Sequence, residues 1–466
     1  MTVLSQLTIE SVDLEGQGLA RDNGKVIFVE GALIGEVVDV EITRSKTSYA
    51  KGQAIAWHRE SYQRITPQCP HFGTCGGCAM QHLEASAQLA AKQRALEDTL
   101  WHVGRLKAEQ VLSPLDGPAW RYRTRARLTA RMVEKKGGML FGFHERKSSF
   151  VAAIDSCLTL HTRVSEMMPA VRDLIASLSI ARRVPQAEVA VGEGDPPVIV
   201  WVLRILEPLN TKDQQKLKAF ADEWHVQFWL QPGGPASAAA FYPINFPALV
   251  YHLPEFNLRM PFSPVDFTQI NPAMNQIMVK RAVDLLGLKA NDRVADFFCG
   301  LGNFTLAVAR RLETIAQGYQ SSSFQVIGIE GSQALTRRAL ENAQLHGLQT
   351  LVEFSCCNLF EIDSKWLNRL GRLDKILLDP PREGAHALCL ALAQQAKEYV
   401  PNRAPTLKAT LAPPQRIVYV SCNPATLARD AAILVHEGGW KLKQAGIINM
   451  FPQTSHVESI AVFERD

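Results

Sequence analysis

The C-terminal part of the chain alternates short apolar runs with amphipathic segments, which is the pattern of parallel strands joined by helices. One amphipathic segment, residues 332–346, begins at a serine cap and ends at Gly347. The alternation predicts an α/β fold, with a doubly wound parallel sheet over residues 263–466. The expected strands are Arg293–Cys299, Phe324–Glu330, Val352–Cys356, Lys375–Asp379, Ile417–Cys422 and Val457–Phe463.

The first 65 residues have a different pattern. Short strand-like runs at 26–29, 37–42 and 53–57 are separated by glycine turns, which indicates a small β-barrel of the oligonucleotide-binding (OB-like) type. Basic residues follow these strands, and they fit a nucleic-acid surface and a solvated rim equally well. Residues 66–262 mix strand and helix patterns and are expected to form a central domain.

A row of arginines in the central domain favours contact with nucleic acid. If this segment is a strand, its two-residue period places all four arginines on one face. Four guanidinium groups on one face repel each other unless an anion lies across them, and a phosphate backbone is a natural anion. A face wetted by water and local carboxylates is the alternative. The residues are Arg121, Arg123, Arg125 and Arg127, with Tyr122, Ala126 and Leu128 expected in the core.

Composition narrows the class of protein. A chain of 466 residues is too long for one core, and its net charge of +4 permits a nucleic-acid partner without requiring one. No apolar run is long enough to span a membrane, and acidic Glu10 and Asp13 stand where a signal peptide would be basic and then apolar. We therefore expect a cytoplasmic protein without a membrane partner. Nine cysteines, an odd number, favour metal binding or catalysis over a disulfide scaffold.

Three of these cysteines lie close together on a glycine-rich stretch, with spacing Cys69-x5-Cys75-x2-Cys78, and Cys157 follows far downstream. Four thiolates can hold an iron–sulfur cluster or a tetrahedral zinc ion. Zinc sites usually pair two CxxC units, whereas here three ligands cluster and one is remote. The spacing therefore favours an iron–sulfur cluster over zinc, and any metal over free thiols; Cys157 is the ligand that spacing supports least.

The α/β half carries chemistry in the loops after its strands. A glycine turn in FFCGLGNF (297–304) allows a cofactor to lie against bare backbone, and Glu330 ends the next strand, where a carboxylate can accept hydrogen bonds from ribose hydroxyls. Thr305 replaces the third glycine of a dinucleotide motif. This combination suggests S-adenosylmethionine as the cofactor.

Two further motifs concern the reaction. Arg382 follows Asp379-Pro-Pro at the position where enzymes that methylate exocyclic amines often carry an aromatic residue. This difference disfavours nitrogen methylation and favours a carbon atom as the target. Cys422 ends a buried strand just before a helix, whose N-terminus would stabilise a thiolate. Glu458 lies just inside the last strand, and His456 before it is more simply explained as a solvated loop residue.

Taken together, FFCGLGNF, LLDPPR (377–382), SCNPATLARD (421–430) and PQTSHVE (452–458) resemble the RNA uracil-C5 methyltransferases, in the order found in that family. The first 60 residues resemble a TRAM domain, and the cysteine spacing resembles the family's [4Fe-4S] cluster. All three features together resemble the bacterial branch that acts on 23S ribosomal RNA. The resemblance implies a Rossmann-like S-adenosylmethionine-dependent methyltransferase domain over residues 263–466, a TRAM domain over 1–65, and a central domain over 66–262. It also implies that residues 81–115 pack with the catalytic domain.

The resemblance also assigns roles. Cys422 matches the nucleophile and Glu458 the general base. A monomer acting on 23S ribosomal RNA is expected, with S-adenosylmethionine and a [4Fe-4S] cluster as cofactors. Phe267 falls at an aromatic position near the target base, and Arg382 is a further expected RNA contact. The implied cofactor contacts are Gln269, Phe298, Asn303, Glu330, Asn358 and Asp379, and the implied cluster ligands are Cys69, Cys75, Cys78 and Cys157.

Three alternatives stay open at this level. The same chemistry could act on another ribosomal or transfer RNA uridine. A radical S-adenosylmethionine enzyme could also combine a TRAM domain with a cluster, but it would use a Cys-x3-Cys-x2-Cys spacing and leave one iron without a cysteine. A non-catalytic RNA-binding protein would be expected to lack Cys422 or Glu458, and this chain has both.

Overall fold

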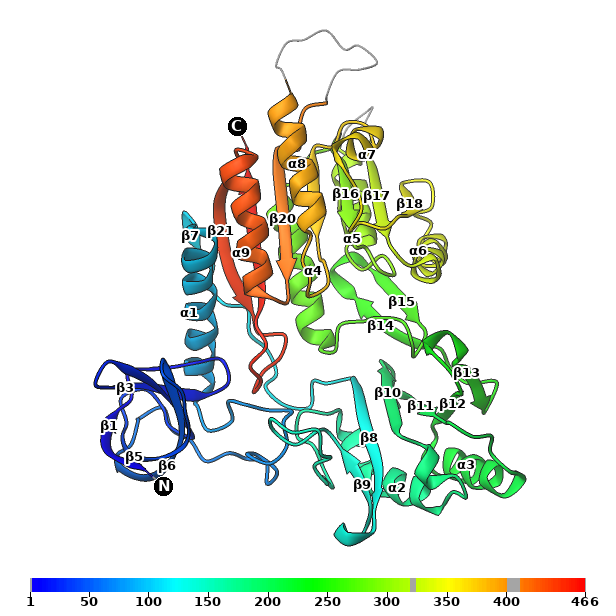
Figure 1. Ribbon diagram of the computed structural model, residues 1–466. Coiled ribbons are helices and arrows are strands. Elements are labelled where there is room, and N and C mark those ends of the chain that lie inside the picture. The colour runs from blue at the N-terminus through cyan, green and yellow to red at the C-terminus, as the bar shows by residue number, and fades with distance from the viewer. Residues whose placement is uncertain (1, 319–323, 400–410, 466) are drawn as a thin grey trace.

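The computed structural model describes residues 2–318, 324–399 and 411–465. Figure 1 shows three parts: a small barrel at the N-terminus, a central sheet, and a larger α/β unit whose strands end toward the other two. Among the described residues, no helix is both long and apolar enough to cross a bilayer.

The N-terminal barrel is a curled six-stranded sheet, ordered β1-β5-β6-β4-β3-β2. Its interior is apolar, and Val29, Val38 and Val40 have no exposed surface. Glu30 forms ion pairs with Arg146 and Lys147 (both 3.1 Å), which join the barrel to the central part. The strands are β1 (Val3–Thr8), β2 (Ser11–Val12), β3 (Gln17–Asp22), β4 (Lys25–Glu30), β5 (Val37–Ser45) and β6 (Tyr49–Arg59).

The central part is a second six-stranded sheet, ordered β13-β12-β11-β10-β8-β9, with helices α2 and α3 packed on it. Its core is built around Trp201, which is fully buried. A separate hairpin of β14 and β15 leads into the α/β unit. The elements are β8 (Arg125–Val133), β9 (Gly138–Gly142), α2 (Thr162–Ser177), β10 (Gln186–Gly192), β11 (Val198–Arg204), α3 (Thr211–Trp224), β12 (Gln227–Gln231), β13 (Ala239–Tyr242), β14 (Leu249–Leu253) and β15 (Leu258–Phe262).

The α/β unit contains an eight-stranded sheet, ordered β18-β17-β16-β19-β20-β22-β21-β7. The five strands from β18 to β20 are parallel, as the sequence predicts. The expectation of a wholly parallel sheet is wrong, because β22 runs antiparallel between β20 and β21. The strands are β7 (Gln110–Val111), β16 (Arg293–Phe297), β17 (Gln325–Glu330), β18 (Val352–Cys356), β19 (Lys375–Leu378), β20 (Arg416–Ser421), β21 (Lys441–Ile448) and β22 (Glu458–Glu464).

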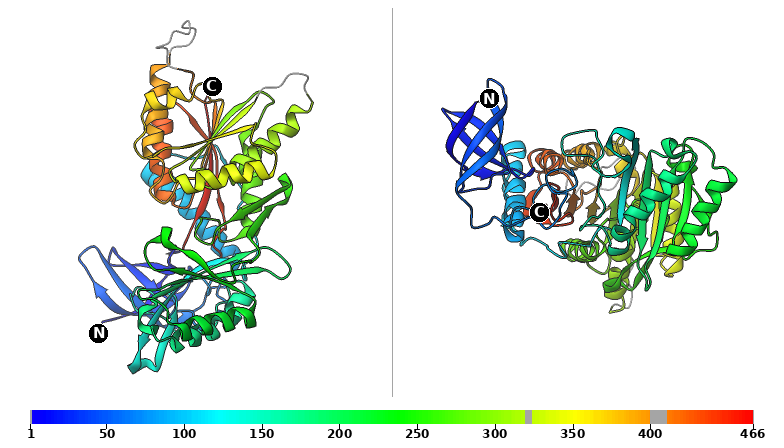
Figure 2. Two further views of the ribbon diagram at one scale, coloured as in Figure 1. Left: turned by 90° about the vertical axis from the view of Figure 1, so that its right-hand side faces the viewer. Right: turned by 90° about the horizontal axis from the view of Figure 1, so that it is seen from below.

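Helices cover both faces of this sheet, as the left view of Figure 2 shows. Alternate residues of one strand face opposite sides of the sheet: Val294 belongs to the apolar core that includes residues of α4, α5 and α6, whereas Ala295 belongs to the core that includes residues of α1, α8 and α9. The helices are α1 (Ala85–Gly104), α4 (Pro272–Leu286), α5 (Thr305–Ala316), α6 (Gln333–Leu345), α7 (Ser364–Arg369), α8 (His386–Glu398) and α9 (Pro424–Ala432).

Helix α1 lies against the α/β unit although its sequence lies between the barrel and the central sheet. It packs on α9 and β21, and β7, which follows it, pairs with β21 at the edge of the sheet. The Glu84 carboxylate caps the start of α1 by accepting from the backbone amide of Ser86 (2.8 Å). Residues 85–111 thus connect the N-terminal segments physically with the C-terminal half.

Candidate active site and cysteine pocket

The carboxyl ends of four parallel strands meet at one edge of the large sheet. The register pairs Phe297 with Ile329 and with Leu378, and Leu378 with Tyr419. The loops that follow these strands therefore start side by side, which is where ligands bind in open α/β sheets. The structure brings together at this edge Phe298, Glu330, Asp379 and Cys422.

Cys422 and Glu458 lie on neighbouring strands. Ser421, the last residue of β20, pairs with Ser459 in β22, and the Ser459 hydroxyl donates to the Ser421 carbonyl (3.1 Å). Because the two strands are antiparallel, the end of β20 meets the start of β22, which puts Cys422 and Glu458 next to each other. Glu458 is only 2% exposed, whereas Cys422 is half-buried.

The electrostatics of this pair oppose the stabilisation that the sequence predicts for a Cys422 thiolate from the N-terminus of α9. Burial, together with the Glu458 and Asp379 carboxylates, raises the pKa of Cys422 to about 11, and the nearby Arg382 guanidinium lowers it only in part. Burial and Asp379 also hold the pKa of Glu458 well above its ordinary value. Three acidic groups in one dry site disfavour one another's charge, so a proton must leave the site before the thiolate is stable.

Asp379 provides a test of this electrostatic picture. Burial raises the pKa of Asp379 to about 7, so the folded protein binds this proton more tightly than the unfolded chain does. Asp379 therefore costs stability progressively as the pH rises from the ordinary aspartate range to about 7. We expect Asp379→Asn to raise the midpoint of thermal unfolding, and to raise it several degrees more at pH 8 than at pH 5. Equal gains at the two pH values in a calorimetric scan would contradict a protonated Asp379.

The glycine turn after β16 is held open by the next strand. Phe298 and Gly300 both have positive φ (+66° and +57°), and the space beside the Gly300 α-carbon is empty. The Glu330 carboxylate accepts from the amides of Gly300 (3.0 Å) and Ser332 (2.9 Å), which fixes the turn while leaving lone pairs free. The turn therefore fits the cofactor role that the sequence suggests for Phe298 and Glu330.

The other expected cofactor residues surround this turn. The Asn303 side-chain oxygen accepts from the Tyr251 hydroxyl (2.8 Å) and the Asn275 amide (3.1 Å), so central and helical elements orient it. The Asn358 oxygen accepts from the backbone of Phe360 (3.2 Å), whose ring lies 5.7 Å from that of Phe298. Gln269 lies in the segment before α4 and is partly exposed.

Sequence reasoning missed Asp296, the residue before this turn. Asp296 is fully buried, one of its oxygens accepts from the Thr305 hydroxyl (2.5 Å), and the other has no partner among the described residues. Burial raises its pKa to about 8, with a smaller contribution from Asp379. A polar residue inside a buried apolar run was the available signal.

The expected row of four arginines is not formed. Strand β8 begins only at Arg125, Arg121 has a left-handed backbone (φ +59°), and the Arg123 guanidinium lies over the Phe143 ring, 6.0 Å from its centroid. Arg127 is exposed but paired with Glu188 (3.0 Å). Tyr122, Ala126 and Leu128 do face the core, as expected.

Arg125 has instead become a structural anchor. Its guanidinium is buried and donates to the backbone carbonyls of Pro264 (2.7 Å) and Asp266. These contacts hold the segment that carries Phe267, whose side chain is 68% exposed. The sequence pattern could not reveal this, because the partner carbonyls lie about 140 residues away in the chain.

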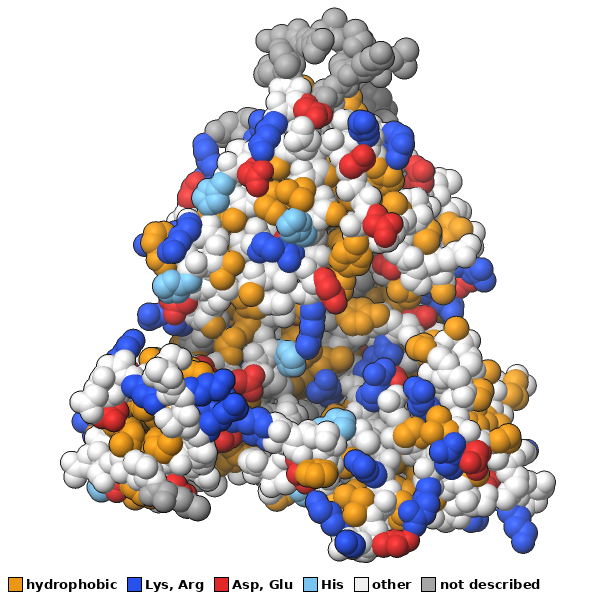
Figure 3. All heavy atoms as spheres, viewed as in Figure 1, with side chains coloured by type: hydrophobic (Ala, Val, Ile, Leu, Met, Phe, Trp, Pro, Cys, Tyr) orange, Lys and Arg blue, Asp and Glu red, His pale blue; other side chains and the backbone are white. Residues whose placement is uncertain are grey.

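Arg382 and His456 are both exposed at the mouth of the site, where an Arg382 nitrogen lies 3.3 Å from His456 Nδ1. The expectation that His456 is an exposed loop residue is confirmed. Figure 3 shows Lys and Arg side chains gathered on the barrel where it faces the central hollow, and again within that hollow below the α/β unit.

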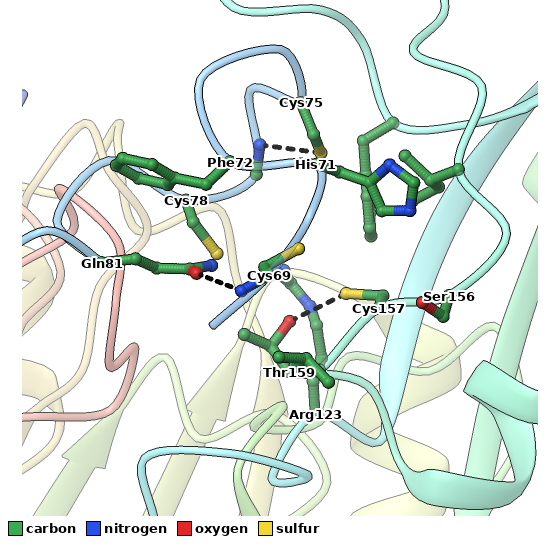
Figure 4. A pocket seen from close by; sticks show the side chains of 14 residues that line it. Cys69, His71, Phe72, Cys75, Cys78, Gln81, Arg123, Ser156, Cys157 and Thr159 are labelled. Atoms are coloured by element: carbon green, nitrogen blue, oxygen red, sulfur yellow. Dashed lines mark hydrogen bonds between the residues drawn. The ribbon is translucent and has the colours of Figure 1, made fainter. Parts of the chain in front are cut away.

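Four cysteines from two distant segments line one pocket, seen in Figure 4. The Cys75 sulfur accepts from the Gly77 amide (3.4 Å), the Cys157 sulfur lies 3.2 Å from the Thr159 hydroxyl, and Arg123 forms part of the wall. Within the described parts of the chain, no three His, Cys, Asp or Glu side chains are arranged to hold a single metal ion. The pocket residues are the expected Cys69, Cys75, Cys78 and Cys157.

Comparisons with known proteins agree with this architecture. Residues 254–466 match the family model for tRNA (Uracil-5-)-methyltransferase, and residues 6–55 match the TRAM domain. A solved Pyrococcus abyssi tRNA (uracil-54, C5)-methyltransferase, in complex with S-adenosyl-L-homocysteine, superposes with a TM-score of 0.69 at 19% identity, covering 98% of this chain and 100% of that one. This likeness establishes the S-adenosylmethionine-dependent methyltransferase fold.

Two relatives align over nearly the whole chain. The 23S rRNA (uracil(1939)-C(5))-methyltransferase of Bordetella avium is 55% identical over 98% of this chain and 90% of its own length. The enzyme of the same name from Burkholderia lata is 53% identical over 99% of this chain and 95% of its own length. On this similarity and the two family matches, the chain belongs to the RNA uracil-C5 methyltransferase family, in the group that contains the 23S rRNA enzymes.

Proposed function

We propose that this protein transfers a methyl group from S-adenosylmethionine to C5 of a uridine in 23S ribosomal RNA, and that the uridine is the one numbered 1939 in the names of its relatives. The observation that carries the proposal is that Cys422, directly after β20, lies next to Glu458, at the start of β22, at the strand edge that also carries the glycine turn. The near full-length relatives support the choice of 23S ribosomal RNA.

The proposed reaction begins with Cys422. C5 of uracil is a poor nucleophile until a thiolate adds to C6, forming a carbon–sulfur bond and pushing the ring electrons onto C5 and O4. In the free protein the thiol holds its proton, with a pKa of about 11. Glu458, in its carboxylate form, is placed to accept this proton, and it must pass the proton to solvent before it can act again as a base. Arg382 stabilises the resulting negative charge.

The second half of the reaction needs a base. When bound, S-adenosylmethionine would supply an electrophilic methyl group to activated C5, and S-adenosylhomocysteine would be the leaving group as the methyl–sulfur bond breaks. The methylated ring then holds both a proton and a methyl group at C5. Glu458 removes the proton, the C5–C6 double bond re-forms, and the Cys422 thiolate leaves. A buried carboxylate with a raised pKa binds a proton readily at neutral pH and so suits this role.

The residues around the glycine turn are proposed to hold the cofactor. Glu330 has lone pairs left for ribose hydroxyls, and the bare backbone at Gly300 admits a close approach. Phe298 and Phe360 offer an apolar wall for an adenine ring. The proposed contacts are Gln269, Phe298, Asn303, Glu330, Asn358 and Asp379.

The target uridine must leave its stack to reach Cys422. Exposed Phe267 is proposed as the aromatic surface near the flipped base, with Arg382 on the phosphate backbone. Arg121, Arg123 and Arg127 are weaker candidates for RNA contact, because they do not share a face. Arg125 contributes indirectly by holding the Phe267 segment.

Incubating the protein with unmodified 23S ribosomal RNA and labelled S-adenosylmethionine, then mapping the label, tests the proposal. We expect one labelled uridine, methylated at C5. A transfer RNA arm tests the main competing substrate, because the solved relative with this fold is a transfer RNA enzyme. Label only in transfer RNA, or in a base other than uridine, would overturn the assignment.

We also propose that the four cysteines of the pocket hold one [4Fe-4S] cluster. Their convergence from residues 69–78 and 157 into one pocket supports this ligand set. Four cysteines leave no iron open, which weighs against a radical S-adenosylmethionine enzyme and favours a structural role.

The protein is further proposed to be a cytoplasmic monomer. Cell fractionation would test its location, and sedimentation would test its oligomeric state.

Anaerobically purified protein should be brown and contain about four irons per chain. We expect Cys157→Ser to lose most of this iron, because one of four ligands is removed. Cys356→Ser is the matched control, since Cys356 is an exposed cysteine outside the pocket, and it should keep the full content. Zinc in place of iron, or full iron content in Cys157→Ser, would contradict the ligand set.

A further inference from the structure

The loop of residues 449–457 lies between β21 and β22 and leads into Glu458. It is held by segments that precede this loop in the chain by more than 300 residues. Its centre is Gln453, which is 5% exposed and has a left-handed backbone (φ +70°). Figure 1 shows this loop reaching down from the α/β unit toward the N-terminal segments. A strained, buried conformation persists only where the surroundings impose it.

The first of these segments is the cysteine loop. The amides of Ala79 and Met80, the two residues after Cys78, both donate to the Gln453 carbonyl (2.9 and 3.0 Å). Tyr122 makes a second link, because its hydroxyl donates to the Pro452 carbonyl (2.9 Å), and the next residue, Arg123, lines the cysteine pocket. Both sides of the pocket therefore touch the loop that leads to Glu458.

Helix α1 provides the other support through Gln88. Its side-chain nitrogen donates to the Gln453 side-chain oxygen (3.0 Å), and its oxygen accepts from the Gln453 amide (3.1 Å). The same nitrogen contacts the carbonyls of Met80 (3.0 Å) and Leu83 (2.8 Å). One buried side chain thus ties the cysteine loop and the catalytic loop together.

Lys92 lies one turn further along α1 and is 1% exposed. Its ammonium donates to the Asn449 side chain and to the Phe451 carbonyl (both 2.9 Å). Burial lowers the pKa of Lys92 to about 8, so keeping a cation here is costly. Hydrophobic packing alone would not require a lysine at this position, which points to a role in orienting the loop.

The far end of the loop reaches the catalytic residues. Glu458 follows it directly, and His456 contacts Arg382, a cation whose proximity lowers the pKa of Cys422. A displacement of the loop would therefore move the carboxylate and the guanidinium together. Positions in an active site must hold to a fraction of an ångström for efficient proton transfer.

We propose that Gln88 and Lys92 are positioning residues for proton abstraction, and that they transmit the folded state of the cysteine pocket to Glu458. This inference rests on the proposed function. If it holds, a protein with a disturbed anchor still adds Cys422 to uridine and still transfers the methyl group, but it removes the C5 proton slowly.

The test uses Gln88→Met and Lys92→Met in the full chain, which keep side-chain size and remove the hydrogen bonds. We expect kcat to fall about 10- to 100-fold with a KM for RNA within about threefold of the parent. A methylated protein–RNA adduct should accumulate on denaturing gels, and release of tritium from C5-tritiated uridine should slow equally. Lys92→Arg should recover most of the activity, since it retains the donor.

Arg94→Met is the matched control, because Arg94 is exposed on the same helix and forms an ion pair with Asp98 (2.9 Å), away from the loop. It should behave as the parent does. Parent-like turnover in Gln88→Met, or lost turnover without any trapped adduct, would overturn the positioning role. If the parent itself neither methylates RNA nor forms an adduct, the proposed function fails instead.

A second readout does not depend on activity. Hydrogen–deuterium exchange is measured on the parent as purified anaerobically and after its iron is removed with a chelator. We expect peptides covering 449–457 to exchange at least several-fold faster without iron, whereas β16 stays protected. An unchanged exchange rate in peptides covering 449–457 would contradict the proposed link between the cysteine pocket and Glu458.

Discussion

Replacing Cys422 with alanine should abolish turnover, with kcat falling about ten-thousand-fold or more. Without the thiol, no nucleophile adds to C6 of uracil. C5 therefore does not become nucleophilic, and no covalent adduct forms. Cofactor binding should change little, because Glu330 and the glycine turn do not depend on Cys422. Methyl transfer and adduct formation are followed with labelled cofactor and denaturing gels, and cofactor affinity is measured by calorimetry.

Cys389→Ala is a useful comparison, because Cys389 is also a buried cysteine of the α/β unit but lies in α8 within the core. It should lower stability without removing the adduct. Normal methylation by Cys422→Ala would exclude the nucleophile assignment.

Replacing Glu458 with glutamine should block the last step of the reaction, in which the C5 proton is removed and the methylated RNA is released. Glutamine cannot accept the C5 proton, so thiolate addition and methyl transfer can proceed while release fails. We expect turnover to fall at least about a thousandfold and a methylated RNA adduct to accumulate and survive denaturation. Because Glu458 is also proposed to take the thiol proton, the adduct should form more slowly at pH 7 than at pH 9, where the Cys422 thiol ionises more readily.

His456→Ala separates the two acid–base candidates in this loop. His456 is exposed and contacts Arg382, so its loss should leave substantial activity. A trapped adduct in His456→Ala with normal turnover in Glu458→Gln would reverse the assignment. RNA binding must be measured alongside, so that weak binding in either variant is not mistaken for a blocked step.

The sequence by itself predicted six strands of the large sheet closely, but it did not predict β7 or β21. Val352–Cys356 is observed as expected, and the other predicted strands differ from the observed ones by one or two residues at their ends. Apolar runs, caps and glycine turns are signals within a few residues of the elements they define, so no distant contact is needed to read them. The motifs that follow these strands were expected at one edge of the sheet, because the carboxyl ends of parallel strands lie at the same edge.

The sequence also predicted the grouping of the four cysteines, since three lie within ten residues and a soft metal centre needs a fourth thiolate. It did not predict the mixed order of the sheet. Strand β22 enters between β20 and β21, and β7 joins from residues 110–111. Pairing between strands so distant in the chain depends on how whole faces pack together.

Only the tertiary structure decided the electrostatics and the supports of the site. The pKa of Cys422 is raised because folding buries the thiol and brings the Glu458 and Asp379 carboxylates close to it from two other strands. These effects outweigh the helix N-terminus that the local sequence predicts. The sequence pattern predicts Arg125 as a surface cation, but its guanidinium donates hydrogen bonds to backbone carbonyls about 140 residues away in the chain. From the sequence, Lys92 is an ordinary helical lysine. In the structure it is buried and donates a hydrogen bond to Asn449, which lies 357 residues later in the chain. Charge, burial and hydrogen bonding depend on neighbours in space, and those neighbours exist only once the chain has folded.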